Sequence, residues 1–177
     1  MPSNKNDQNY LIQILYSSAG AASNAIGPFS SWLLAGFGGA FAFILGNMNS
    51  AGKYISISSL RCSIILFIFA LIAGLFEKMA GALIIAGVKS FDAGSQIGKL
   101  FTNIEINQAV VISEVEKTIF KPIRLLFRRT IEKANSGDRL VMARFYSRLA
   151  QIQMIMVFIE FVLCTIAAVV IVAGLKI

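Results

Sequence analysis

The sequence predicts an all-α fold: a polytopic helical membrane protein with three membrane segments, or four in one alternative, and a small cytoplasmic helical domain. Of the 177 residues, 56% are hydrophobic and only 14% are charged, whereas soluble domains average about 45–50% apolar and about 25% charged residues. Three apolar stretches are long enough for a helix to cross a bilayer. Eleven of the sixteen basic residues also lie together in residues 89–150, between the last two of these stretches.

Residues 8–27 have the pattern of an amphipathic helix, with Leu11 and Leu15 at helical spacing and polar residues between them. Gly27-Pro28 is expected to end this helix, so that residues 1–28 form a segment of their own. The helix would lie on the lipid headgroups as an interfacial anchor, or it would line the inside of an assembly. Because the N-terminus has no sustained apolar core, we expect an uncleaved signal anchor rather than a signal peptide.

The first expected span is residues 29–46, FSSWLLAGFGGAFAFILG, which carry no charge. Eighteen residues of helix cover roughly 27 Å, enough for the core of a bilayer. Ala35 and Gly39, like Gly36 and Ala40, are small residues four apart. Such pairs let helix backbones approach closely in lipid, within one chain or between chains.

The second apolar run, residues 60–88, is interrupted by Glu77 and Lys78. The ten residues after this pair are too few to span a bilayer alone. We therefore expect a span over residues 60–77 in one long helix that continues to residue 88, completing a membrane hairpin over residues 29–88. The alternative is a re-entrant element or a fourth crossing.

Charge predicts the orientation of the chain. Residues 89–150 carry eleven basic residues, whereas the loop of residues 47–59 carries only Lys53. Basic loops stay on the cytoplasmic side of a bacterial inner membrane. Three crossings then put the N-terminus inside and the C-terminus just outside.

The basic region is expected to contain helices over residues 104–119 and 123–134, and a last helix that starts at Asp138 and continues into a C-terminal span within residues 151–177. Anionic lipid headgroups are the first expected partner of its basic side chains, and an acidic soluble cytoplasmic protein is the second. Nucleic acid is the least favoured partner, because no aromatic residues are interleaved at base-stacking spacing. The candidate binding residues are Lys121, Arg124, Arg128, Arg129, Lys133, Arg139, Arg144 and Arg148.

Glu160 is a charged residue about six residues inside the last span. A carboxylate there costs at least about 2.5 kcal/mol unless it is paired or hydrated. Two interpretations remain open. Glu160 pairs with a cation at the inner end of the second span, for which Lys78 beside Glu77 is the candidate, or it faces a water-filled lumen between subunits as an ion or proton site.

No catalytic motif is present, and the chain has no histidine. The two cysteines, Cys62 and Cys164, have no disulfide or zinc spacing and are expected to be small buried hydrophobic residues. We therefore expect neither an enzyme nor a cofactor or metal. A chain with three spans has little interior of its own, so the small face and the intramembrane charge favour a homo-oligomer.

In layout, the segment SWLLAGFGGAFAFILGN (residues 31–47), the basic helical insert and the second long span resemble the small multi-span membrane subunits of bacterial anti-phage defence systems. Examples are the Kiwa membrane subunit and the two-span effectors linked to nucleotide signalling. The resemblance implies an inner-membrane sensor or effector that docks a soluble partner and alters or reports the state of the membrane. The alternatives are a structural subunit of a secretion or transport machine and a stand-alone pore or holin-like protein.

Overall fold

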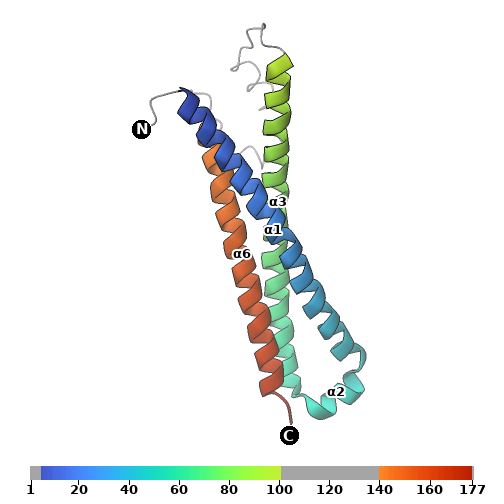
Figure 1. Cartoon of the computed structure of the whole chain (residues 1–177). Coiled ribbons are helices and arrows are strands. Elements are labelled where there is room, and N and C mark those ends of the chain that lie inside the picture. The colour runs from blue at the N-terminus through green and yellow to red at the C-terminus, as the bar shows by residue number, and fades with distance from the viewer. Residues whose placement is uncertain (1–4, 101–139, 177) are drawn as a thin grey trace, which may run out of the picture. The chain divides into compact units, whose positions relative to one another are not determined.

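The computed structural model describes residues 5–100 and 140–176, and these are almost entirely helical (Figure 1). The helices are α1 (Lys5–Gly46), the short α2 (Met48–Tyr54), α3 (Ile57–Leu100) and α6 (Leu140–Ala173). Three of them, α1, α3 and α6, are long and apolar enough to cross a membrane. The all-helical class with three such helices is therefore confirmed for the described residues. The helices expected over residues 104–119 and 123–134 lie outside them.

Helix α1 does not end at Gly27-Pro28, as the sequence pattern predicted, but continues through it as one helix of 42 residues. Proline costs a helix one backbone hydrogen bond. A break would expose several backbone groups, which is more costly in an apolar environment, where neighbouring side chains can satisfy the freed groups instead. The carbonyl oxygen of Gly27 accepts hydrogen bonds from Ser31 Oγ and from Lys78 Nζ on α3.

Helix α3 runs for 44 residues without a break at Glu77 and Lys78. This is the one long helix that the sequence predicted. The described residues contain neither the re-entrant element nor the fourth crossing of the alternative prediction. Glu and Lys are good helix formers, so the charged pair interrupts the hydrophobicity of the segment but not its helical geometry. The helix extends beyond residue 88, where the sequence pattern had placed its end.

The chain divides into two compact units. Unit 1 comprises residues 1–20 and 84–149, and unit 2 comprises residues 21–83 and 150–177, each as far as it is described. The core of unit 1 is aromatic. The Tyr16 ring stacks on Phe91 with their centroids 4.3 Å apart, and its centroid lies 5.4 Å from that of Tyr146. Buried Ile12 and Ala143 complete this apolar core.

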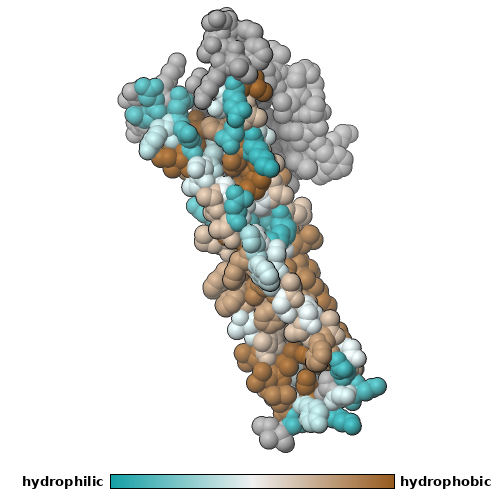
Figure 2. Space-filling model, turned by 45° about the vertical axis from the view of Figure 1, so that its right-hand side comes forward, coloured by the Kyte–Doolittle hydropathy of each residue, from teal (hydrophilic) through white to brown (hydrophobic). Residues whose placement is uncertain are grey.

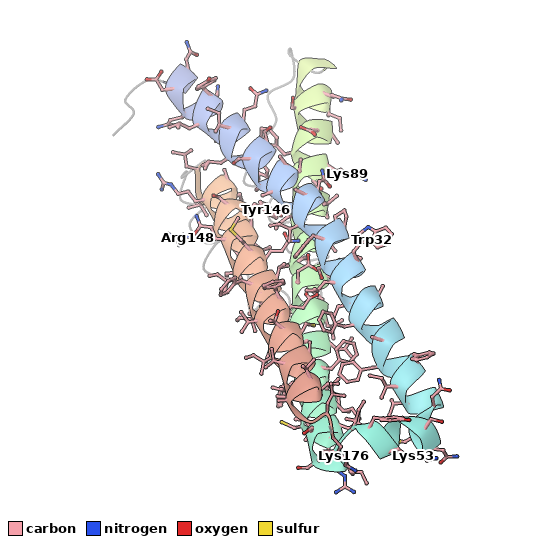
Figure 3. The ribbon with its side chains drawn as sticks, turned by 60° about the horizontal axis from the view of Figure 1, so that its bottom comes forward. Trp32, Lys53, Lys89, Tyr146, Arg148 and Lys176 are labelled. Atoms are coloured by element: carbon pink, nitrogen blue, oxygen red, sulfur yellow. The ribbon has the colours of Figure 1, made fainter. Side chains whose placement is uncertain are left out.

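At one end of unit 2, backbone hydrogen bonds join the segment before α3 to the segment after α6. The amide of Ser56 donates to the carbonyl of Gly174 at 2.9 Å, and the amide of Lys176 donates to the carbonyl of Tyr54 at 2.8 Å. Figure 3 shows Lys53 and Lys176 at this same end. The C-terminal end of α6 therefore lies beside the loop between α1 and α3, as it must if three helices cross a membrane in sequence.

The surface of unit 2 carries large apolar side chains. Trp32 is 79% exposed and Phe43 is 72% exposed, and Figure 2 shows hydrophobic side chains covering much of this unit, with hydrophilic ones at its loop end. Soluble monomers seldom expose apolar patches of this extent. This surface is typical of a helix bundle that faces lipid.

Candidate functional site: a buried polar cluster

The inner face of unit 2 carries polar side chains at positions that repeat every seven residues. Seven residues make two helical turns and return to nearly the same face. On α6 this spacing joins Gln153 to Glu160, and on α3 twice this spacing, fourteen residues, joins Ser63 to Glu77. All four side chains are buried. We call the five side chains Ser30, Glu77, Lys78, Gln153 and Glu160 the polar cluster.

Glu160 lies in the interior of unit 2 with no exposed surface. Its Oε2 accepts a hydrogen bond of 2.9 Å from Ser30 Oγ on α1. A hydroxyl donor of this kind stabilises a carboxylate. The bond joins α6 to α1 through two side chains that are both buried.

Glu77 is equally buried and joins α3 to α6. Its Oε1 accepts a hydrogen bond of 2.6 Å from Gln153 Nε2, and its Oε2 lies 3.3 Å from Lys78 Nζ. The Lys78 side chain is 41% exposed. Its ammonium group also donates to the Gly27 carbonyl and, at 2.8 Å, to Ser31 Oγ on α1. The ammonium group of this partly exposed lysine thus bridges the buried Glu77 on α3 and α1.

Two glycines of α3 make room for these polar side chains. A Cβ atom on Gly81 would lie 2.8 Å from Gln153 Nε2 and 3.2 Å from Ser23 Oγ. A Cβ atom on Gly74 would lie 3.3 Å from Glu160 Oε2 and still closer to Leu34 Cδ1. The absence of side chains at these positions is what allows Gln153 and Glu160 to lie between the helices.

Three buried oxygen atoms of the cluster have no hydrogen-bond partner in the part of the chain that the structure describes: Glu77 Oε2, Gln153 Oε1 and Glu160 Oε1. Glu77 Oε2 still has the Lys78 ammonium group as its ion-pair partner. The two carboxylates and one ammonium group leave the cluster with one net negative charge if all are ionised. That charge belongs to Glu160, because Lys78 is engaged with Glu77.

The surroundings of Glu160 differ from those that either interpretation of the sequence predicted. Within the described residues, the ion pair of Lys78 is with its neighbour Glu77, and Glu160 is bound by Ser30 instead. Glu160 does not face a lumen between subunits either, because its side chain is buried inside a single chain. The sequence reasoning missed Ser30 and Gln153. The seven-residue spacing from Gln153 to Glu160 was the available signal.

The small-residue face of α1 lies on the outside of the chain. Ala35, Gly36, Gly39 and Ala40 are all exposed, and a Cβ atom on either glycine would meet nothing within 4 Å. Within the described part of the chain, this face therefore does not pack against another helix, and the alternative of packing between chains is the one left open.

The basic binding residues fall mostly outside the described residues. Arg144 and Arg148 are the two that can be placed, and both are exposed on α6 in unit 1; Arg148 is labelled in Figure 3. The remaining candidates, Lys121, Arg124, Arg128, Arg129, Lys133 and Arg139, lie in residues 101–139, which are not described.

The cysteines differ from each other. Cys164 is buried, as predicted, whereas Cys62 is exposed, because it lies on the outer side of α3. In residues 5–100 and 140–176, no three His, Cys, Asp or Glu side chains come together in a way that could hold a metal ion.

Comparisons with protein-family models, with curated proteins and with solved structures gave no match.

Proposed function

We propose that the protein is a non-enzymatic, multi-pass protein of the bacterial inner membrane that acts as a sensor or effector. In this proposal, residues 89–150 lie in the cytoplasm and dock a soluble partner or anionic lipid, and the signal passes along α6 to the polar cluster. One observation carries the proposal: α6 is a single helix of 34 residues that bears both the exposed Arg144 and Arg148 and the buried Gln153 and Glu160.

The continuity of α6 supports such a relay because a helix transmits rotation and translation along its axis. Arg148 and Glu160 are twelve residues apart, or about 18 Å of helix. A shift of a fraction of a turn would carry Glu160 away from Ser30 and Gln153 away from Glu77. Packed helices that exchange one set of partners for another are a common basis of switching, and ionisable residues inside a span are typical of functional sites.

The partner is tested by neutralising, rather than deleting, the basic residues of the segment that the sequence predicts as a basic helix. Full-length tagged protein is cross-linked in its native membrane and captured, with Arg124, Arg128, Arg129 and Lys133 replaced together by Gln. The matched control replaces Lys53 and Lys176 by Gln at the other end. We expect the basic-helix variant alone to lose its cross-linked partner. An identical set of partners in all three samples would refute docking through this helix.

The orientation needs its own test, because the basic residues also determine topology. Single cysteines at Ser50 and at Ser136, in a chain with Cys62→Ser and Cys164→Ala, are labelled in intact cells with a maleimide that does not cross membranes. We expect labelling at position 50 and none at position 136 until the cells are opened. The reverse pattern would contradict the proposed orientation, and labelling of the Gln variant shows whether its topology is preserved.

The exposed small face of α1 supports a homo-oligomer, because such faces associate in lipid through close backbone contact. Gly39→Leu adds bulk where a single chain has free space. We therefore expect this variant to fold normally and to lose oligomers in cross-linking at native abundance. Unchanged oligomers would show that the interface between chains does not lie on this face.

The layout resemblance supports a place in an anti-phage system. Phage plating on cells that express the protein with its neighbouring genes tests this, with Glu160→Gln as the variant expected to lose protection. Killing by the protein expressed alone would instead favour the holin-like alternative.

A further inference from the structure

We propose that the polar cluster binds one monovalent cation, a proton or a sodium ion, with the Glu160 carboxylate as its principal ligand. This inference goes beyond the proposed function, because it names a ligand and does not require a docked partner. It starts from the charge balance of the cluster, in which Lys78 pairs with Glu77 and leaves Glu160 without an ion-pair partner among the described residues.

The hydrogen-bond pattern of the cluster indicates the chemistry of the missing ligand. Gln153 donates through Nε2 to Glu77 Oε1, so its free atom is the acceptor Oε1. Glu160 receives Ser30 Oγ at Oε2, so its free atom is Oε1. All of the unpartnered buried atoms in the cluster are thus acceptors. The cluster therefore lacks a hydrogen-bond donor or a positive charge at these atoms. A bound proton would supply a donor, and a sodium ion would supply a positive charge.

No other described group of unit 2 neutralises the charge of Glu160. The charged or ionisable groups around Glu160 are Glu77 and Lys78 on α3 and Cys164 on α6, while α1 contributes Ser30. The Lys78 ammonium group is directed to Glu77, the Gly27 carbonyl and Ser31. A buried carboxylate without a counter-charge costs several kcal/mol, and it becomes neutral or takes up a cation instead.

The arrangement accommodates both cations. A proton needs only Glu160 Oε1, and the resulting O–H group would supply the missing donor. Sodium, a hard cation, prefers carboxylate and hydroxyl oxygens, which are the atoms that Glu160 and Ser30 offer side by side. Release of either cation would leave an uncompensated buried carboxylate at the contact between α6 and α1.

The test uses the full-length protein in lipid nanodiscs and two measurements. Infrared difference spectra are recorded between mildly alkaline and mildly acidic pH, because a protonated carboxylic acid has its own carbonyl stretching band. The midpoint of thermal unfolding is measured in sodium chloride against choline chloride. The variants are Glu160→Gln, which retains the shape, and Asp92→Asn, which removes an exposed carboxylate from α3 as a matched control.

A proton site predicts a carboxylic-acid band that is lost in Glu160→Gln and retained in Asp92→Asn. Ser30→Ala should keep the band and shift its frequency, because it removes the donor to Oε2, and this variant assigns the band if Glu160→Gln does not fold. A sodium site predicts a midpoint that rises by several degrees in sodium chloride in the wild type and in Asp92→Asn only. If the wild type shows neither a band nor a sodium effect, the carboxylate is ionised and empty, and the proposal is wrong.

Discussion

The two units of the chain are built from the same helices but have opposite kinds of core. In unit 1 the interior is apolar and aromatic, with the Tyr16 ring stacked on Phe91. In unit 2 the fully buried side chains include two carboxylates, an amide and two serine hydroxyl groups, while large apolar side chains such as Trp32 lie outside. The first pattern is that of a protein in water and the second is its inverse.

The difference between the two cores matches the interactions that stabilise helix packing in water and in lipid. In water, burying aromatic surface is favourable, and an aromatic core can hold a short helical unit together. In lipid, helices gain nothing by hiding apolar side chains, so close packing of small residues and hydrogen bonds between helices must hold them together. The composition of the core therefore changes near the division between residues 83 and 84 of α3. The predictions below test this contrast, from the largest expected effect to the smallest.

The largest loss is expected from Tyr16→Ala. This change removes the central ring of the unit 1 core, and truncation of a buried aromatic side chain costs about 3 kcal/mol or more. Tyr10→Ala is the control, because Tyr10 is 67% exposed on the same helix. Unfolding by SDS in mixed micelles, followed by circular dichroism, gives both free energies of unfolding. Equal losses in the two variants would mean that the aromatic core does not stabilise the fold.

The second prediction concerns glycine inside and outside unit 2. Gly81→Leu must displace Gln153 and Ser23, and overpacking of this kind costs about 2 kcal/mol. Gly36→Leu makes the same change where nothing lies within 4 Å, so the free energy of unfolding should not fall, and improved helix propensity favours a small gain. The same SDS titration compares the two variants. A larger loss at Gly36 would contradict the helix packing described for unit 2.

Ser30→Ala is expected to cost about 1.5 kcal/mol, because it removes the hydrogen-bond donor to a buried carboxyl group. Ser18→Ala is the control, since that hydroxyl donates only to the Leu15 carbonyl of its own helix at an exposed position. A double-mutant cycle with Glu160→Gln isolates the coupling between the two residues. A coupling energy of zero would show that the bond between α1 and α6 does not contribute to stability.

The sequence predicted the helical class and the residues that are unusual in an apolar segment, and it failed where the outcome depended on neighbours. Glu77, Lys78 and Glu160 were identifiable because charge is costly in such a segment. Their partners were not, because the register between α3 and α6 depends on close approach at Gly74 and Gly81, which no single helix reveals.

The predicted helix end at Gly27-Pro28 was wrong for a similar reason. Local propensity treats this dipeptide as a break, but it takes no account of the cost of unpairing several backbone groups in apolar surroundings, and the helix continues. Ser30 and Gln153 escaped notice because an uncharged polar residue in an apolar stretch is common and usually harmless. For Gln153, the seven-residue spacing to a carboxylate, Glu160, is what distinguishes it.

The smallest effect is expected at Ser63, whose hydroxyl donates to the Ala167 carbonyl across α3 and α6 at 2.9 Å. Both partners are neutral, and neutral bonds between membrane helices contribute about 0.6 kcal/mol on average. We therefore expect Ser63→Ala to lose less than half of what Ser30→Ala loses in the same SDS titration. Thr165→Val, which removes a hydroxyl bonded only within α6, should have no measurable effect. If Ser63→Ala costs as much as Ser30→Ala, the carboxyl group at Ser30 has no special strength, and what stabilises unit 2 is the number of bonds between its helices rather than its buried charge.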